Sequence, residues 1–530
     1  MKSFFAAGGN LPWWMSGLSL FMSFFSAGTF VVWGSVAYQS GWVAIAIQWT
    51  MCISGLIIGF VIAPKWQKTG ALTAAEYITD RLGYGTQKIY TYLFLMISVF
   101  TTGAFLYPVA KIVEVSTGVP IYASIICLGI LILAYTAAGG LWAVIVTDVL
   151  QFVVLTAAVL IVVPLSLSKV GGVSGFVANA PENFFNFVNE EYSPYFLLAF
   201  GLYNLFFIAG NWAYVQRYTS VSTAKDAKKV GWLFGGLYAV SPVIWMLPPM
   251  IYRVLNPDLQ GLADEGAYLL MCKEVLPVGM LGLMLGGMIF ATSSSVNTTL
   301  NISAGVLTND IFKHFRPQTS DQGLVYVGKI ATVVLGVITI IVALLVPKLG
   351  GIVEVVMSLA ALTGGAMFLP PIWALFSKKQ TGQSVLAVTL VSLAVNAFFK
   401  FLAPSLIEVS LSRAAEMALG VTLPIVLLTI TEILFQVKNT SSSQYENYLS
   451  LQNEKEREEQ ENADGNRKGA RVIGVGVLST GGLILILSAL AETGALLVGG
   501  MGVVVLALGA IIIYKNQSVS QPQEAEKIYQ

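Results

Sequence analysis

The chain has 530 residues, of which 56% are hydrophobic and only 11% are charged, and its formal net charge is +1. An ordinary soluble domain carries about 25% charged residues, so this composition excludes a typical soluble enzyme and indicates an integral membrane protein. The near-neutral charge gives no electrostatic basis for binding nucleic acid. The three cysteines are odd in number and predict no disulfide framework.

Apolar stretches long enough to be membrane spans recur along the whole chain. A span needs about 20 residues of helix to cross the hydrocarbon core of a bilayer. On that basis we predict an all-α integral membrane protein with about 14 transmembrane helices. The predicted spans cover residues 11–38, 42–62, 89–113, 121–136, 141–167, 195–215, 230–254, 278–307, 325–346, 352–376, 385–402, 414–435, 472–490 and 496–514.

Lysine and arginine gather in alternate loops, and this pattern predicts the orientation, because cytoplasmic loops carry the positive excess. Examples from four such loops are Lys65, Lys68, Arg217, Lys225, Lys313, Arg316, Lys378 and Lys379. The intervening loops are acidic or neutral. We therefore expect a multi-pass protein of the cell membrane with both termini in the cytoplasm. The long polar stretch 439–471 is expected to be a solvated, partly disordered or helical cytoplasmic linker.

The first span is rich in hydroxyl side chains and glycine. Ser19, Ser23 and Thr29 lie in it, together with Gly28 and Gly34. This pattern suits a helix that unwinds locally and offers its freed carbonyl groups to a cation. Packing of small residues between helices explains the same pattern equally well when this span is considered alone.

The fifth span contains an acidic residue, Asp148, about 12 Å along a helix that would start near Gly140. A buried carboxylate needs a partner to stay charged, and no basic residue lies close to it in the span. The partner could be a neighbouring helix, a bound cation or water in an inner vestibule. We favour the cation over a structural hydrogen bond.

The eighth span, "MIFATSSSVNTTLNISAGVLTNDIF", has the highest density of hydroxyl and amide side chains. Ala291, Ser294, Ser295 and Thr298 follow the spacing i, i+3, i+4 and i+7, so they share one helical face. Hydroxyl and carbonyl oxygens suit a hard cation. Because they carry no formal charge, such a site would hold an alkali cation weakly enough to release it. Ser293 and Thr299 lie off this face, and we expect them to pack or to bond the helix backbone.

Five segments of the chain resemble, in order and spacing, the sodium/solute symporter family, which includes the sodium/glucose, sodium/proline and sialic acid cotransporters. The segments are "SFFAAGGNLPWWMSGLSLFMSFFSAGTF", "GALTAAEYITDRLG", "YTAAGGLWAVIVTDVLQF", "NWAYVQRYTSVSTAKDAKKV" and "GLMLGGMIFATSSSVNTTLNISAGVLTNDIFK". Most members of the family carry one further span ahead of the first segment. The resemblance implies a LeuT-type fold, in which two five-helix repeats are inverted relative to each other.

The resemblance also implies how the chain is divided. The expected parts are a first repeat at 1–168, an extracellular loop at 169–193, a second repeat at 194–382, spans 11 and 12 at 383–436, a cytoplasmic polar loop at 437–471, spans 13 and 14 at 472–516, and a cytoplasmic tail at 517–530. The last four spans are thus additions to the five-plus-five core.

The family's sodium site maps onto the broken part of span 1 and the polar face of span 8. The resemblance implies that sodium is bound by backbone carbonyls and two hydroxyls, which here belong to Met22, Phe25, Ala291, Ser294 and Ser295. Some members have a second sodium site, which would use Asp148, Ser294, Asn297 and Thr298 here. Those members carry two hydroxyl residues at the last two positions, and Asn297 can offer an amide oxygen instead.

The family's substrate contacts map onto spans 1, 2, 3, 6 and 7. The matching residues are Ser26, Thr29, Gln48, Thr101, Asn211, Trp212, Tyr214 and Tyr238. Sialic acid symporters carry a carboxylate-binding arginine near the position of Thr101, and the segment "VFTTGAFLYP" of this chain contains no arginine. A neutral sugar or polyol is therefore the first expectation, while Lys111, two or three turns along span 3, leaves a carboxylate-bearing solute such as sialic acid or an amino acid open.

The expected function is sodium-coupled secondary active symport of a small polar solute by alternating access, with sodium as the coupling ion. The expected partners are the solute and the lipid bilayer, without nucleic acid, and the chain would act as a monomer or weak homo-oligomer. A solute-sensing membrane receptor is the alternative from another class. We do not expect an enzyme, because Asp148 is the only clearly deep acid and no catalytic set of residues accompanies it.

Overall fold

The computed structural model describes residues 11–25, 27–71, 73–135, 141–259, 261–316, 318–437, 445–450, 452, 467–489 and 495–515. These parts are helical apart from short connections and one isolated parallel bridge between Leu11 and Val221. The helices before the long loop 180–193 are α2 (Trp13–Met22), η2 (Thr29–Trp33), α3 (Gly34–Ser40), α4 (Trp42–Ile57), η3 (Ile58–Ile62), α5 (Ala63–Lys68), α6 (Ala74–Leu82), α7 (Tyr84–Thr117), α8 (Ile121–Tyr135), α9 (Leu141–Lys169) and α10 (Gly172–Asn179).

The helices after that loop continue the same pattern to the C-terminus. They are α11 (Pro194–Gly210), α12 (Trp212–Thr219), α13 (Ala224–Leu255), η4 (Gly261–Gly266), α14 (Ala267–Val275), α15 (Val278–Val306), η5 (Leu307–Phe312), α16 (Lys313–Phe315), α17 (Asp321–Leu345), η6 (Val346–Leu349), α18 (Ile352–Thr363), η7 (Gly364–Phe368), α19 (Leu369–Phe376), α20 (Gly382–Ala397), η8 (Phe398–Leu402), α21 (Ala403–Leu406), α22 (Arg413–Val437), α24 (Arg467–Ala489) and α25 (Ala495–Lys515).

Within the described residues, nine helices are long and apolar enough to cross a membrane, or up to ten if the bent pair α11 and α12 is one span. Shorter apolar helices of 10–17 residues lie in the predicted fourth, eighth and thirteenth spans. The predicted first span is divided into α2, η2 and α3. The all-helical membrane architecture is therefore shown, whereas the count of 14 and the five-plus-five arrangement remain predictions.

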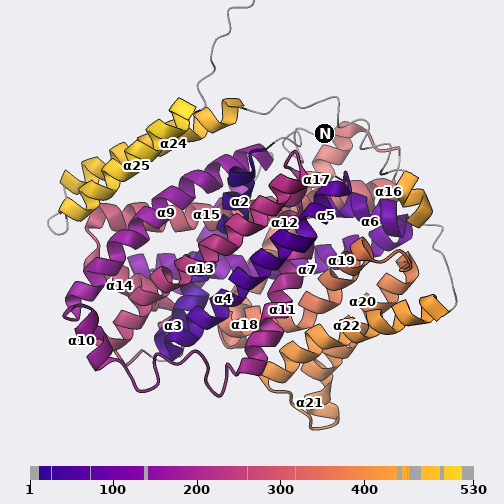
Figure 1. Cartoon of the computed structure of the whole chain (residues 1–530), viewed down its shortest axis with the longest axis horizontal. Coiled ribbons are helices and arrows are strands. Elements are labelled where there is room, and N and C mark those ends of the chain that lie inside the picture. The colour runs from indigo at the N-terminus through magenta and orange to yellow at the C-terminus, as the bar shows by residue number, and fades with distance from the viewer. Residues whose placement is uncertain are drawn as a thin grey trace, which may run out of the picture.

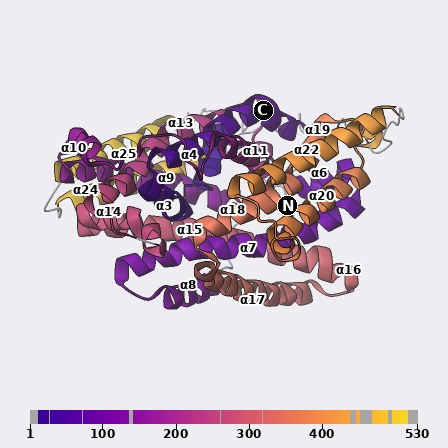
Figure 2. The same ribbon diagram turned by 90° about the horizontal axis from the view of Figure 1, so that it is seen from below.

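The helices form a broad bundle with the C-terminal hairpin at one side. The hairpin of α24 and α25 lies along α9 at one edge of the molecule, and α20 and α22 lie at the opposite edge (Figure 1). Viewed from below, α17 and α8 form an outer layer against α7 (Figure 2). Helices α2, α4 and α13 pack together in the interior.

Glycine allows α4 with its continuation η3 to approach α13 closely. Gly55 and Gly59 are four residues apart and face Gly231 and Gly235, which are also four residues apart. A Cβ atom on Gly231 would lie 2.6 Å from the Cα atom of Gly59, which is closer than real atoms approach. Small residues with this spacing are the usual means of close helix packing in a membrane.

Candidate functional site

The first span breaks where the sequence predicts it, and the break lies against α15. Helix α2 ends at Met22, residues 23–25 are not helical, and Ala27 is again helical. The amide N–H of Ala27 donates a hydrogen bond to Oγ1 of Thr292, at 3.0 Å. Thr292 is only 1% exposed. The structure thus brings together the two segments of the predicted sodium site, one residue away from Ala291.

Three of the predicted sodium ligands have side chains that the structure describes. Met22 and Phe25 are buried, and Ser295 is half-buried. Ser26 and the side chains of Ala291, Ser293, Ser294, Asn297 and Thr298 lie outside the described residues. Thr299 donates its hydroxyl to the carbonyl oxygen of Ser295, at 3.0 Å, which confirms the predicted bond to the helix backbone.

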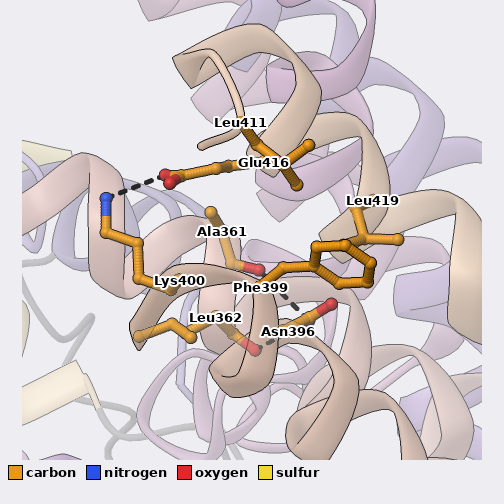
Figure 3. A pocket seen from close by; sticks show the side chains of 8 residues that line it. All are labelled: Ala361, Leu362, Asn396, Phe399, Lys400, Leu411, Glu416 and Leu419. Atoms are coloured by element: carbon orange, nitrogen blue, oxygen red, sulfur yellow. Dashed lines mark hydrogen bonds and ion pairs between the residues drawn. The ribbon is translucent and has the colours of Figure 1, made fainter. Parts of the chain in front are cut away.

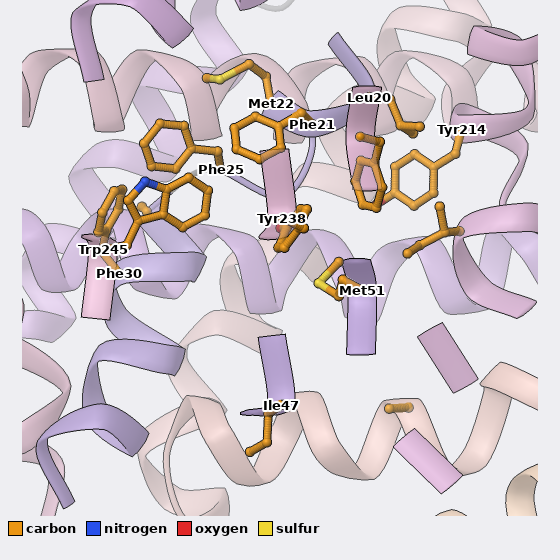
Figure 4. Close-up of a cluster of buried hydrophobic side chains, with 14 of the residues drawn as sticks. Leu20, Phe21, Met22, Phe25, Phe30, Ile47, Met51, Tyr214, Tyr238 and Trp245 are labelled. Carbon is orange, nitrogen blue, oxygen red and sulfur yellow. The ribbon is translucent and has the colours of Figure 1, made fainter. Parts of the chain in front are cut away.

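Aromatic rings line the break of span 1 and connect it to two other predicted spans. The ring of Phe25 stacks on Trp245 of α13, with centroids 4.0 Å apart. The ring of Phe21 contacts that of Tyr238, also of α13, with centroids 5.3 Å apart. The labelled rings of this cluster lie close together in Figure 4. Phe24 contacts Tyr214 of α12 at 4.8 Å. Tyr214 and Tyr238 therefore both lie beside span 1, as the predicted substrate site requires.

Thr29, another predicted substrate contact, is buried and donates its hydroxyl to the carbonyl oxygen of Phe24. This bond joins the non-helical segment of the break to the helical segment that follows it. Backbone carbonyl groups in an unwound segment have no regular helical donor, so a side-chain hydroxyl can take that place.

The sixth span is also broken, which the sequence reasoning missed. Helices α11 and α12 meet at an angle of 61°. Asn211 lies between them in an extended conformation, and its side-chain oxygen accepts a hydrogen bond from the amide of Ala213, at 3.0 Å. Trp212 stacks on Phe94 of α7, with ring centroids 4.6 Å apart. The pair Gly210 and Asn211 is a helix stop followed by a strong N-cap residue, and this signal could have predicted the break.

Asp148 has protein partners from two other helices. Its Oδ2 atom accepts a hydrogen bond from Oγ of Ser19, at 2.6 Å, and lies 3.9 Å from Nη2 of Arg217. Nε of Arg217 also donates to Oγ of Ser19, at 3.3 Å. The sequence left a neighbouring helix open as the partner of Asp148, and the structure shows that α12 supplies a basic residue.

Gln48 of α4 is the most distinctive of the predicted substrate contacts. It is 1% exposed, and neither its amide oxygen nor its amide nitrogen has a hydrogen-bond partner among the described residues. A buried polar group without a partner costs about 1–3 kcal/mol. An orphaned amide at this depth is therefore an indication that a polar ligand or water completes its hydrogen bonds.

Thr101 and Lys111 of α7 have local partners. The hydroxyl of Thr101 donates to carbonyl oxygens of its own helix, those of Ile97 and Ser98. Lys111 forms an ion pair with Glu114 of the same helix, at 2.8 Å. The charge of Lys111 is therefore already balanced, which weakens the case for a carboxylate ligand there.

A polar layer covers the end of span 1 in the segment before α14. Asp264 of η4 accepts hydrogen bonds from Ser35, at 2.9 Å, and from Gln39. Its neighbour Glu265 accepts hydrogen bonds from the hydroxyl of Tyr107, at 2.6 Å, and from the amide of Ile352, at 2.8 Å. Burial raises the pKa of both carboxyl groups. The layer connects α3, α7 and α18.

A small pocket lies outside this region, between α18, α22 and the segment α20 to η8 (Figure 3). Its wall contains Asn396, whose side chain donates to the carbonyl oxygens of Ala361 and Leu362. Lys400 and Glu416 form an ion pair at its mouth, at 2.8 Å. These residues join span 10 to spans 11 and 12 and include none of the predicted site residues.

The sequence reasoning missed three residues that complete the site, namely Thr292, Arg217 and Trp245. Thr292 precedes the serine run but is off the predicted polar face. Arg217 was used only as a mark of orientation, although it lies within the "NWAYVQRYTS" segment. Trp245 is one apolar residue among many in its span. Only the packing of distant helices shows that Thr292 and Trp245 reach the break of span 1 and that Arg217 reaches Ser19 in the helix before it.

Comparison with known proteins gives a consistent result. The family model of the sodium:solute symporter family matches residues 4–392. A sodium/glucose cotransporter of Vibrio parahaemolyticus is 28% identical over 439 residues, which cover 76% of this chain and 80% of that protein. The sodium/myo-inositol cotransporter 2 of Bos taurus is 29% identical over 381 residues, covering 64% of this chain and 56% of that protein.

Solved structures share the fold. A Na⁺-coupled sialic acid symporter in a substrate-bound outward-open state has a TM-score of 0.67 at 21% identity, over 82% of this chain and 92% of that chain. A transporter of the nucleobase-cation-symport-1 family has a TM-score of 0.51 at 16% identity, over 82% and 95%. The match to the family model, over most of the chain, identifies this protein as a member of the sodium:solute symporter family.

Proposed function

We propose that the protein is a sodium-coupled symporter that imports a small neutral polar solute, a sugar or polyol, by alternating access. The observation that carries this proposal is the hydrogen bond between Ala27 and Thr292, because it joins the broken first span to α15 at the residue next to Ala291. Family membership and relatives named as sugar and inositol cotransporters support it.

In this proposal sodium binds at the break of span 1. Its ligands are the carbonyl oxygens of Met22, Phe25 and Ala291 and the hydroxyls of Ser294 and Ser295. Uncharged oxygen ligands suit a hard alkali cation and hold it weakly enough for release. Sodium would stabilise the outward-open state because it binds that state more tightly than the inward-open state.

A second sodium site is proposed at Asp148, Ser294, Asn297 and Thr298. The contact between Asp148 and Arg217 is 3.9 Å long, which is longer than a hydrogen bond. A cation that approached Asp148 would compete with Arg217 for the same carboxylate. Occupation of this site would therefore loosen α12 from α9, and the two sites need not be filled in the same conformation.

The proposed solute site lies between the break of span 1 and the break of span 6. Its residues would be Ser26, Thr29, Gln48, Thr101, Asn211, Trp212, Tyr214 and Tyr238. The orphaned amide of Gln48 can donate and accept, which suits the hydroxyl groups of a sugar or polyol. The ion pair between Lys111 and Glu114 favours a neutral solute over a carboxylate.

The inward sodium gradient would drive accumulation. Movement of one positive charge into the cell is worth about 2.3 kcal/mol per 100 mV of membrane potential. We further propose that both termini are cytoplasmic and that the two inverted repeats comprise spans 1–5 and 6–10. The breaks in the first span of each proposed repeat are consistent with that symmetry.

Uptake by the purified protein in proteoliposomes tests the proposal. A panel of labelled sugars, polyols, amino acids and sialic acid is offered with an inward sodium gradient and with an equal potassium gradient. We expect uptake of a neutral solute with sodium only, and loss of sodium dependence in the double variant Ser294→Ala with Ser295→Ala. Ser479→Ala is the matched control, since Ser479 is exposed on peripheral α24. No sodium-driven uptake of any solute on the panel would contradict symport.

A further inference from the structure

Part of the long polar linker packs on the protein instead of extending into solvent. Residues 445–450 are helical, and Gln452 follows them. Tyr448 is only 8% exposed, whereas Leu449 beside it is 38% exposed. The sequence predicts a solvated, partly disordered or helical linker here; residues 445–450 are helical, and Tyr448 is the one buried residue among them. We call residues 445–450 with Gln452 the latch segment.

The latch segment contacts α6 and the end of α5, which together connect spans 2 and 3. The rings of Tyr448 and Tyr77 meet edge to face, with centroids 5.9 Å apart. The guanidinium of Arg81 lies over the ring of Tyr445, 5.0 Å from its centroid. The side chain of Gln452 donates a hydrogen bond to the carbonyl oxygen of Lys68.

Tyr77 connects the latch segment to the broken sixth span through Trp66. Its ring packs edge to face on Trp66 of α5, at 4.9 Å. Nε1 of Trp66 donates a hydrogen bond to the carbonyl oxygen of Ala209, at 2.8 Å. Ala209 lies two residues before Asn211, where α11 and α12 bend. A continuous series of contacts therefore leads from the latch segment to the bend.

Arg81 ties the same helix to span 10. Its side chain is fully buried and donates from Nη2 to the carbonyl oxygen of Ser377, at 2.7 Å, just after α19. Nε and Nη1 of Arg81 have no hydrogen-bond partner among the described residues. Buried donors without partners cost free energy, so exposure of these two donors to water would offset part of the cost of opening the contact.

We propose that the latch segment is a cytoplasmic latch that holds α6 against the broken sixth span and so disfavours the inward-open state. The position of the latch on α6 does not depend on the transported solute, whereas its effect on sodium binding rests on the proposed function. Release of the latch would shift the population toward the inward-open state, which binds sodium more weakly in the proposed mechanism.

The first test measures hydrogen exchange of the full-length protein in detergent. Tyr448→Ala should increase exchange of the amides of α6, residues 74–82, because it removes the ring that covers Tyr77. Leu449→Ala is the matched control, since it shortens an exposed apolar side chain of the same short helix. Tyr445→Ala, which removes the ring under Arg81 and its contact with Tyr448 but leaves Tyr448 over Tyr77, serves as a milder variant if Tyr448→Ala does not fold.

The second test determines the half-saturating sodium concentration by fitting the rise in melting temperature over a series of sodium concentrations, with potassium replacing sodium at constant ionic strength. An aromatic pair of this kind corresponds to about a 2- to 12-fold change in an equilibrium. We expect the half-saturating sodium concentration to rise by that factor in Tyr448→Ala and to stay unchanged in Leu449→Ala.

The outcomes separate the latch from the transport proposal. Unchanged exchange in α6 would refute the latch and leave the proposed symport intact. Increased exchange with an unchanged half-saturating sodium concentration would refute the proposed effect of the latch segment on the inward-open state. If the native protein showed no sodium-induced stabilisation at all, the sodium proposal would fail, and the exchange data would still decide whether the segment holds α6.

Discussion

Replacing Thr292 with valine should weaken sodium binding while leaving the size of the side chain almost unchanged. The substitution removes Oγ1, which accepts the hydrogen bond from the amide of Ala27, at 3.0 Å, and itself donates to the carbonyl of Met288, at 3.0 Å. At 1% exposure, water cannot easily replace the lost acceptor. Leaving a buried amide unpaired costs about 1–3 kcal/mol.

That penalty applies in full only to the conformation in which the break of span 1 lies against α15. If this is the conformation that binds sodium, the half-saturating sodium concentration should rise by about 5- to 140-fold. The assay is the shift in melting temperature with sodium, because a ligand that binds only the folded state stabilises it by RT ln(1 + [L]/Kd). It requires no knowledge of the solute.

Two variants control for indirect effects. Thr292→Ser keeps the oxygen and should retain most of the sodium affinity. Thr299→Val removes a hydroxyl from the same helix that only bonds the carbonyl of Ser295, and should change the affinity by less than about twofold. If Thr292→Val folds and binds sodium like the native protein, the contact between the two segments is not part of the sodium-binding conformation.

Three further outcomes are expected. Gly231→Ala should lower the melting temperature, at a cost of about 1–3 kcal/mol, because its Cβ atom would lie 2.6 Å from the backbone of Gly59, whereas Gly236→Ala faces open space and should be harmless. Burial raises the pKa of Asp264, so its carboxyl group binds a proton more tightly in the folded protein than in the unfolded chain. The free energy of unfolding should therefore fall as the pH rises above the ordinary pKa of aspartate and toward the raised pKa of Asp264. Thermal unfolding from pH 4 to pH 7 should show this fall in the native protein and a smaller one in Asp264→Asn. Gln48→Leu should abolish solute uptake in proteoliposomes without changing sodium-induced stabilisation, and uptake at the native level would remove Gln48 from the solute site.

Hydropathy and motif spacing were sufficient to predict the membrane class, most span positions and the family. Each of these depends on local composition, since a helix must satisfy its own backbone hydrogen bonds to cross lipid. The serines and glycines of span 1 fitted local unwinding and small-residue packing equally well, and the structure shows that α2 ends at Met22. The break at Asn211 had a local signal as well, a glycine followed by an N-cap residue.

Partners across the bundle were not predictable, because they depend on which faces of distant helices meet. The sequence showed that Asp148 needed a partner, but only the packing of α12 on α2 and α9 brought Arg217 to it. In the same way, Thr292 became part of the site through its contact with Ala27, 265 positions away in the sequence. The burial of Tyr448 against α6 was equally hidden, since a single aromatic residue in a polar linker has no local pattern. The sequence by itself therefore determined which segments are apolar enough to span a membrane and which polar groups they carry, because both depend on local composition, while the tertiary structure decided which of these groups meet.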